Sequence, residues 1–205
     1  MKYAYINPTI VAVTDVPQDL FLDLFSMVQN AHSKSDLNDE GDPKISIRGG
    51  QQIQLYPNEF NLDVSKLKNY VESIAREYMD NVAIQNPSLD ISGVRPVMTS
   101  AWTIKQTEGD YQTLHTHESN LSGNIYIEVP EFDSNSKDHD GNVEFRFPVT
   151  RNPAHFIFAD NWRYAPIERT MVVFPGNIPH TVYPWKGRGN RTILAWDVKL
   201  VDKNS

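Results

Sequence analysis

The chain has 205 residues, of which 40% are hydrophobic, and its formal net charge is −7. This length suffices for one domain with a sizeable core, and the negative charge argues against a general nucleic-acid binder, which would need a basic face. There is no cysteine, so disulfides and thiolate metal sites are excluded. Any metal ion must therefore be held by histidine or carboxylate side chains.

The N-terminal stretch MKYAYINPTIVAVTDVP has one lysine and lacks the long apolar core of a signal peptide. No run of the sequence reaches the roughly 18 apolar residues of a membrane-spanning helix. We therefore expect a soluble, cytoplasmic protein with no membrane partner. The sequence leaves its oligomeric state open.

The first part of the chain predicts two helices and short strands. Residues 3–14 alternate loosely and are expected to form an opening strand. Apolar residues recur at helical spacing over 18–32, and again over 67–82 after Asp63, a residue type that often caps a helix. Between these helices, residues 45–55 predict a pair of short strands. We interpret both apolar stripes as core faces rather than cofactor sites.

From Val94 onward the apolar residues alternate with a period of two, which is typical of strands. Turns rich in Gly, Asn, Asp and Pro separate stretches at 96–106, 122–129, 143–147, 170–174, 181–185 and 191–200. This pattern predicts a mainly β fold with a helical annex: a double-stranded β-helix, the cupin-like jelly roll, buttressed by two N-terminal helices. We expect a single domain over 1–205, with the annex in 1–93 and the jelly-roll core in 94–200.

A long segment between Phe147 and Arg169 interrupts the predicted strands and contains Trp162 and Tyr164. Long insertions between jelly-roll strands often serve as lids, and these two aromatic residues could touch substrate. The tryptophans as a group are expected to be packing residues: Trp102, Trp162, Trp185 and Trp196.

Two histidines, His115 and His117, stand two positions apart just before an alternating run. On an extended strand, side chains at i and i+2 leave from the same face, so both imidazoles should point toward one spot. His180 precedes a later strand in FPGNIPHTVYP. Neutral imidazole is a suitable iron ligand at pH 7. The pattern favours a metal site over the alternative that these histidines only bond one another or the backbone.

The third metal ligand can be either of two neighbouring residues. Mononuclear iron sites commonly use two histidines and one carboxylate, but here His117 occupies the usual carboxylate position and Glu118 follows it. Strand geometry favours His117, because residue 118 should point away from His115. A turn beginning at His117 would reverse that choice.

Arg191 heads the apolar strand RTILAWDV, so its guanidinium should be partly buried. A buried arginine needs an anion, and its planar fork meets a carboxylate with two parallel hydrogen bonds. The alternative is a structural salt bridge to an Asp or Glu. Arg188 is a rival cation, but it lies in the turn KGRGN and is expected to be solvated.

The stretches GDYQTLHTHESNLSGNIYIEVP and MVVFPGNIPHTVYP…RTILAWDV resemble motifs of the 2-oxoglutarate/Fe(II) oxygenases of bacteria and their viruses. The resemblance spans residues 98–199 and implies that Fe(II) is bound by three histidines, His115, His117 and His180. It also implies that Arg191 binds 2-oxoglutarate with help from the hydroxyl of Tyr126. The sequence departs from the family at Asp197, where asparagine is usual, and at Ile125, where a tyrosine is common.

The resemblance implies a dioxygenase that uses Fe(II), 2-oxoglutarate and molecular oxygen to oxidise a C–H bond of an unidentified primary substrate, usually to a hydroxyl. Two other classes stay open: a cupin-like three-histidine metalloenzyme without 2-oxoglutarate, and a non-catalytic jelly-roll binding module. Arg191 discriminates against the former, which needs no carboxylate clamp. Iron binding discriminates against the latter, because a binding module needs no metal. The fold alone does not decide between these classes.

Overall fold

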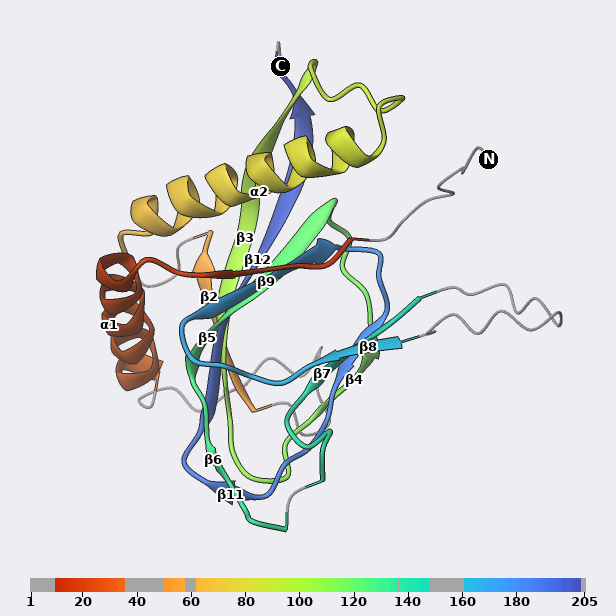
Figure 1. Cartoon of the computed structure of the whole chain (residues 1–205). Helices are drawn as coiled ribbons and strands as arrows, with labels where there is room; N and C mark the ends of the chain where they lie inside the picture. The colour runs from red at the N-terminus through yellow and green to blue at the C-terminus, as the bar shows by residue number, and fades with distance from the viewer. Residues whose placement is uncertain (1–9, 36–49, 58–61, 136, 148–160, 204–205) are drawn as a thin grey trace, which may run out of the picture.

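The computed structural model describes residues 10–35, 50–57, 62–135, 137–147 and 161–203 (Figure 1). Within these ranges strands predominate, which confirms the mainly β prediction. The elements in chain order are β1 (Ala12–Asp15), α1 (Gln18–Ser35), β2 (Gln51–Tyr56), α2 (Ser65–Gln85), β3 (Val94–Gln106), β4 (Gln112–His115), β5 (Leu121–Glu128), β6 (Glu131–Phe132), β7 (Val143–Arg146), β8 (Asn161–Tyr164), β9 (Thr170–Pro175), β10 (His180–Val182), β11 (Gly187–Arg188) and β12 (Arg191–Asp202).

The strands form two facing antiparallel sheets and one short ribbon. The major sheet has the order β1-β9-β5-β12-β3-β2, and the minor sheet has the order β4-β10-β7-β8. The strands β6 and β11 pair separately beyond one end of the sheets (Figure 1). Two facing antiparallel sheets with these crossovers make the double-stranded β-helix that the sequence predicts.

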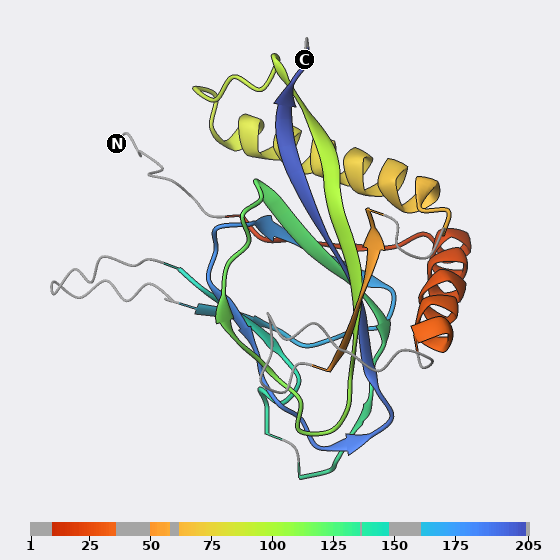
Figure 2. The ribbon, with the colours of Figure 1, turned by 180° about the vertical axis from the view of Figure 1, so that it is seen from behind.

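The strands β3, β5, β9 and β12 of the major sheet send alternate side chains to two different cores, as the pleat requires. On β12, Leu194 and Trp196 pack in the core that lies beneath the two helices. Their neighbours Ile193 and Ala195 pack in a second core between the sheets. Both helices lie on the same outer face of the major sheet (Figure 2). The inner face is therefore free to line a cavity.

The helices confirm the apolar stripes read from the sequence, with different ends. The first helix runs to Ser35, three residues beyond the predicted end. The second begins at Ser65 and has Val64 at its N-cap, so the prediction of Asp63 as N-cap was wrong by one position. The Asp63 carboxylate still accepts a hydrogen bond from the Ser65 backbone N–H at 2.9 Å. Neither helix in the described ranges is long and apolar enough to cross a membrane.

Strands from the predicted annex belong to the major sheet itself. The strand β1 pairs with β9, and β2 pairs with β3. The beginning of the predicted opening strand and the first member of the predicted pair over 45–55 lie outside the described residues.

The long segment before β9 contains an additional strand. Trp162 and Tyr164 belong to β8, which pairs with β7. The ring of Trp162 stacks on Phe145 with centroids 5.9 Å apart. Residues 148–160 of the predicted lid lie outside the described part of the chain.

Candidate active site

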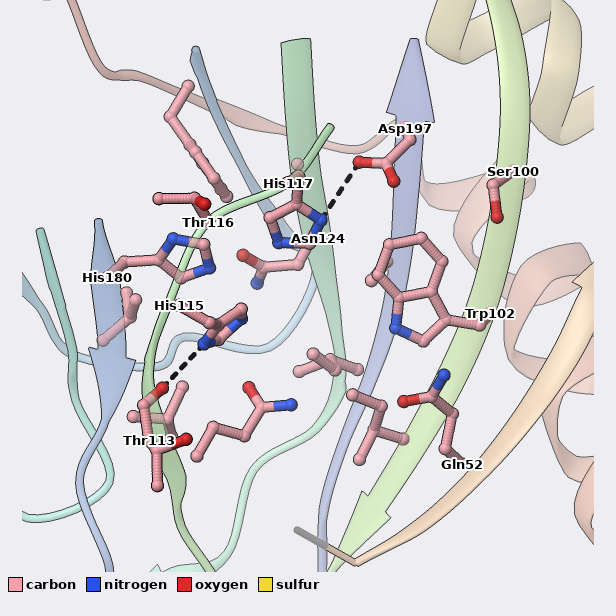
Figure 3. Close-up of a pocket in the computed structure, with 18 of the residues that line it drawn as sticks. Gln52, Ser100, Trp102, Thr113, His115, Thr116, His117, Asn124, His180 and Asp197 are labelled. Carbon is pink, nitrogen blue, oxygen red and sulfur yellow. Dashed lines mark hydrogen bonds and ion pairs between the residues drawn. The ribbon is translucent and has the colours of Figure 1, made fainter. Parts of the chain in front are cut away.

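A cavity of about 520 Å³ opens between the two sheets (Figure 3). Its walls come from residues of β2, β3, β5, β9 and β12 in the major sheet, of β4, β7 and β10 in the minor sheet, and of the loop that follows β4. The three predicted ligand histidines and Arg191 all line this cavity. Tyr126 lies behind that wall, fully buried against Arg191.

The structure brings His115, His117 and His180 together. Pairing of β4 with β10 sets His115 directly opposite His180, and their ring centroids are 4.2 Å apart. The ring of His117 lies 5.4 Å from that of His115 and 5.2 Å from that of His180. One ligand atom from each histidine lies within 4.8 Å of the others. This spacing suits three donors converging on one ion.

The backbone at His117 differs from the continuous strand that the sequence suggested. The strand β4 ends at His115, and His117 lies beyond it. The N–H of His117 instead donates to the carbonyl of Gly176 at 2.8 Å. A Cβ at position 176 would lie 2.4 Å from the carbonyl oxygen of Ser119. Glycine at this position therefore allows the close approach that holds His117 beside His115.

Hydrogen bonds fix the tautomers of all three imidazoles. The Nδ1 atoms of His115 and His180 lie 2.7 and 3.0 Å from the carbonyl oxygens of Thr113 and Ile178. The Nδ1 of His117 lies 3.2 Å from a carboxylate oxygen of Asp197 (Figure 3). Because these oxygens can only accept, each Nδ1 carries a proton, and the lone pair is left on Nε2.

The surroundings also keep His115 and His180 neutral. Burial, together with the neighbouring His115, lowers the pKa of His180 to about 3. Burial likewise lowers the pKa of His115. Metal binding needs the unprotonated imidazole, so the lone pairs of these two residues are available at neutral pH.

The carboxylate of Asp197 accepts hydrogen bonds from three side chains. Besides His117, the hydroxyls of Ser119 and Ser122 donate to its Oδ1 at 3.1 and 2.5 Å. Burial raises the pKa of Asp197, but the hydrogen bonds from His117, Ser122 and Ser119 more than offset this, and the pKa lies below its ordinary value. Asp197 is therefore an ionised group beside the histidine cluster.

Trp102 has a role that the sequence analysis missed. Its ring lines the cavity and stacks on His117, with centroids 5.7 Å apart and an interplanar angle of 23°. Trp185 and Trp196 are buried, as predicted. Trp162 is 37% exposed, and it is not one of the described residues that line the cavity.

Glu118, the alternative third ligand, is exposed and contributes to the lining of the cavity. The group of converging donors among the described residues contains His117 and not Glu118. This arrangement agrees with the strand-face argument for His117.

Arg191 is more deeply buried than the sequence suggested, at 1% exposure. Its Nη1 donates to Oε1 of Gln106 at 2.5 Å, and its guanidinium carbon lies 5.4 Å from the ring centroid of Tyr126. None of the ion pairs in the described ranges includes Arg191, so the alternative of a structural salt bridge is not supported there. Burial lowers the pKa of Arg191, yet arginine stays charged in proteins. Arg191 is therefore a buried cation whose charge no carboxylate of the described residues neutralises.

Unsatisfied polar atoms surround this guanidinium. Arg191 Nε, Gln106 Nε2, Asn124 Nδ2 and the Tyr126 hydroxyl are buried, and none makes a well-formed hydrogen bond within the described residues. The Tyr126 hydroxyl is still close enough to Arg191 and Asn124 to interact with both side chains. An unmade hydrogen bond costs about 1–3 kcal/mol per buried group. Each of these groups can donate, so a carboxylate in this position would satisfy several of them. The residues therefore fit one end of a dicarboxylic acid such as 2-oxoglutarate.

The sequence analysis did not identify Gln106 and Asn124 as site residues. Gln106 is the register partner of Arg191 across β3 and β12. Asn124 stands two residues before Tyr126 on the inward face of β5. The inward alternation of β5 was a usable signal for Asn124. The rival cation Arg188 is exposed on β11 and does not line the cavity.

Comparison with solved structures establishes the fold. A prolyl-4-hydroxylase from Pseudomonas putida is 17% identical, with 93% of each chain covered and a TM-score of 0.54. A prolyl hydroxylase from Trichoplax adhaerens, in complex with a hypoxia inducible factor peptide fragment, is 14% identical, with 95% of this chain and 84% of that chain covered and a TM-score of 0.58. HygX from Streptomyces hygroscopicus, with nickel and 2-oxoglutarate bound, is 11% identical, with 93% and 82% covered and a TM-score of 0.51.

Sequence comparison adds the family. Among curated proteins, none matches the chain at significant similarity. Residues 100–197 match the model of the family described as "Putative 2OG-Fe(II) oxygenase". The matched segment contains the histidine cluster, Tyr126 and Arg191. Over residues 100–197, just under half of the chain, the sequence thus matches this family of Fe(II)- and 2-oxoglutarate-dependent oxygenases.

Proposed function

We propose that this oxygenase hydroxylates a C–H bond of a primary substrate with a site built from two groups of side chains. Three Nε2 atoms, those of His115, His117 and His180, hold the iron. Arg191, assisted by Tyr126, holds a carboxylate of 2-oxoglutarate. When bound, iron and 2-oxoglutarate supply the activation of oxygen; the protein supplies the binding, the orientation and a shielded cavity.

The observation that carries this proposal is the unpaired Arg191. Its buried positive charge has no carboxylate partner in the described residues, although arginine is normally buried only with an anion. It lines the same cavity as the histidines. A small dicarboxylate could therefore reach Arg191 and the histidine cluster from within one cavity.

The two alternatives account for less of the site. A three-histidine metalloenzyme without 2-oxoglutarate would leave Arg191 and its neighbouring donors without an acceptor. A non-catalytic jelly roll would have no use for three imidazoles whose Nε2 lone pairs are all left free. Both alternatives would therefore bear the cost of unsatisfied buried groups.

We infer that the substrate is neutral or cationic where it enters the cavity. The wall formed by β2 and β3 presents Gln52, Gln54, Ser100 and Trp102. Arg191 is the one Lys or Arg among the described residues that line the cavity. Its guanidinium would already be paired with a carboxylate of 2-oxoglutarate. Amide and hydroxyl groups beside a flat indole suit a substrate with amide or hydroxyl groups. Among the described residues of this wall, a small acid or a nucleotide phosphate would find no Lys or Arg side chain to bind it.

The experiment is a screen for substrate-stimulated release of succinate by the Fe(II)-loaded protein. Matched sets of neutral, cationic and anionic compounds should include peptides, sugars, small acids and nucleotides. We expect neutral or cationic compounds to stimulate succinate release by the parent protein. The Arg191→Ala variant should release no succinate with any of the compounds. Stimulation confined to anionic compounds would contradict the substrate inference, and turnover of substrate without consumption of 2-oxoglutarate would contradict the cofactor assignment.

A further inference from the structure

The three histidines do not have the same partners behind them. His115 and His180 each donate from Nδ1 to a backbone carbonyl two residues earlier in the chain. His117 alone among them faces a carboxylate, that of Asp197. His117 is also the residue at the position where mononuclear iron sites commonly have a carboxylate ligand. The proposed ligand set thus lacks a carboxylate, but the carboxylate of Asp197 lies next to His117, the histidine at the usual carboxylate position.

The environment of Asp197 is organised to keep this contact. The side chains of Asp197 and His117 are 18% and 14% exposed. Two hydroxyls, from Ser119 and Ser122, donate to the same Oδ1 that faces His117. Three donors converging on one oxygen fix the carboxylate and leave it little freedom to rotate away.

The imidazole of His117 is equally constrained. The ring of Trp102 stacks on it, and the ring of Phe174 makes an edge-to-face contact with it, with centroids 6.2 Å apart. The chain after it is tied to β12, because Asn120 N–H donates to the carbonyl of Val198 and Asn120 Oδ1 accepts from the N–H of Leu200, at 3.0 and 2.9 Å. The contact between His117 and Asp197 is therefore anchored from both sides.

We propose that Asp197 is a positioning residue that serves as the outer-sphere carboxylate of the metal centre. It holds His117 as the Nδ1–H tautomer, aims Nε2 at the ion, and makes this imidazole a stronger donor than either of the other two. A carboxylate behind a metal-bound histidine fixes the ring and raises ligand basicity. The inference rests on the proposed metal site, and it assigns a role to a residue at which this chain departs from the usual asparagine.

The test compares Asp197→Asn with the parent protein by Mn(II) titration, followed by electron paramagnetic resonance. Asparagine keeps the shape and an acceptor oxygen but removes the charge. We expect the Mn(II) dissociation constant to rise roughly 10–100-fold, the usual cost of losing an outer-sphere partner. Asp202→Asn, at the far end of the same strand and exposed, is the matched control and should leave the constant unchanged.

A spectroscopic measurement separates this role from a merely structural one. In the anaerobic Fe(II)–2-oxoglutarate complex, Asp197→Asn should shift the visible metal-to-ligand charge-transfer band to higher energy, because a less electron-rich iron gives up an electron less readily. Asp202→Asn should leave the band in place. Parent-like Mn(II) affinity and band energy in Asp197→Asn would overturn the inference while leaving the proposed function intact.

A second variant covers the case in which Asp197→Asn fails to fold. The double variant Ser119→Ala/Ser122→Ala retains the charge and loosens the carboxylate. It should weaken Mn(II) binding in the same direction by a smaller factor, and unchanged binding would overturn the inference. A parent protein that binds Mn(II) but not 2-oxoglutarate would contradict the proposed function alone. A parent that binds no metal would contradict both.

Discussion

Arg191 and Gln106 are opposite one another across β12 and β3, and the Arg191 Nη1 donates to the Gln106 Oε1 at 2.5 Å. A neutral amide oxygen satisfies one donor of the guanidinium but does not neutralise its charge. The Arg191 Nε and the Gln106 Nε2 still lack partners among the described residues. This pair is thus a preorganised receptor for a carboxylate, and it leads to the first prediction.

Replacing Arg191 should weaken 2-oxoglutarate binding and leave the metal site intact. Arg191→Lys keeps the charge but loses the planar fork, so we expect a loss of roughly 1–3 kcal/mol, measured by calorimetric titration of the Mn(II)-loaded protein with 2-oxoglutarate. Mn(II) affinity without 2-oxoglutarate should hardly change. The exposed Arg188→Ala is the control; if it weakens binding instead, the assignment of the anchor is wrong.

Removing a histidine of the cluster should reduce metal affinity. His180→Ala deletes a ligand at the centre of the site, so the loss should exceed the roughly 10–100-fold cost of an outer-sphere change. His139→Ala is the matched control, because His139 makes an edge-to-face contact with Tyr183 outside the cluster. Equal Mn(II) affinity in the His180→Ala variant and the parent would refute the site.

The choice of third ligand is tested by two neighbouring substitutions. His117→Ala should abolish most Mn(II) binding, since His117 belongs to the converging donors. Glu118→Ala should bind Mn(II) as the parent does, because Glu118 is exposed and lies outside that group. The opposite result would return the site to two histidines and a carboxylate.

Glycine at position 176 should be required for the position of His117. A Cβ there would lie 2.4 Å from backbone and side-chain oxygens of Ser119. We expect Gly176→Ala to cost about 1–3 kcal/mol of unfolding free energy, as overpacking does, and to weaken Mn(II) binding by displacing the His117 loop. Gly93→Ala is the control, since a Cβ there meets nothing within 4 Å. Denaturant unfolding with equal midpoints for both variants would contradict this role.

Local pattern in the sequence was enough to predict the framework of the fold and to single out four residues that line one cavity: His115, His117, His180 and Arg191. Alternation predicted β3, β5 and β12 nearly to their ends, because one inward and one outward face impose a period of two. The spacing of His115 and His117 predicted a shared target for the same reason, although the strand stops at His115.

The remaining features depend on contacts between residues that are distant in the sequence. Gln106 belongs to the site because β3 and β12 pair in one particular register. Trp102 stacks on His117 because a loop after β4 folds back against the major sheet. A single sequence does not encode such pairings in its local periodicity.

We infer that His115, His117, His180 and Arg191 form one binding unit for Fe(II) and 2-oxoglutarate. With three neutral ligands, the negative charges of 2-oxoglutarate should favour the metal, and the metal should favour 2-oxoglutarate, by the same factor. Anaerobic titration of the parent protein with Fe(II), with and without saturating 2-oxoglutarate, measures this directly. We expect 2-oxoglutarate to tighten Fe(II) binding by about 5–150-fold; equal Fe(II) affinities in the two titrations would contradict the account.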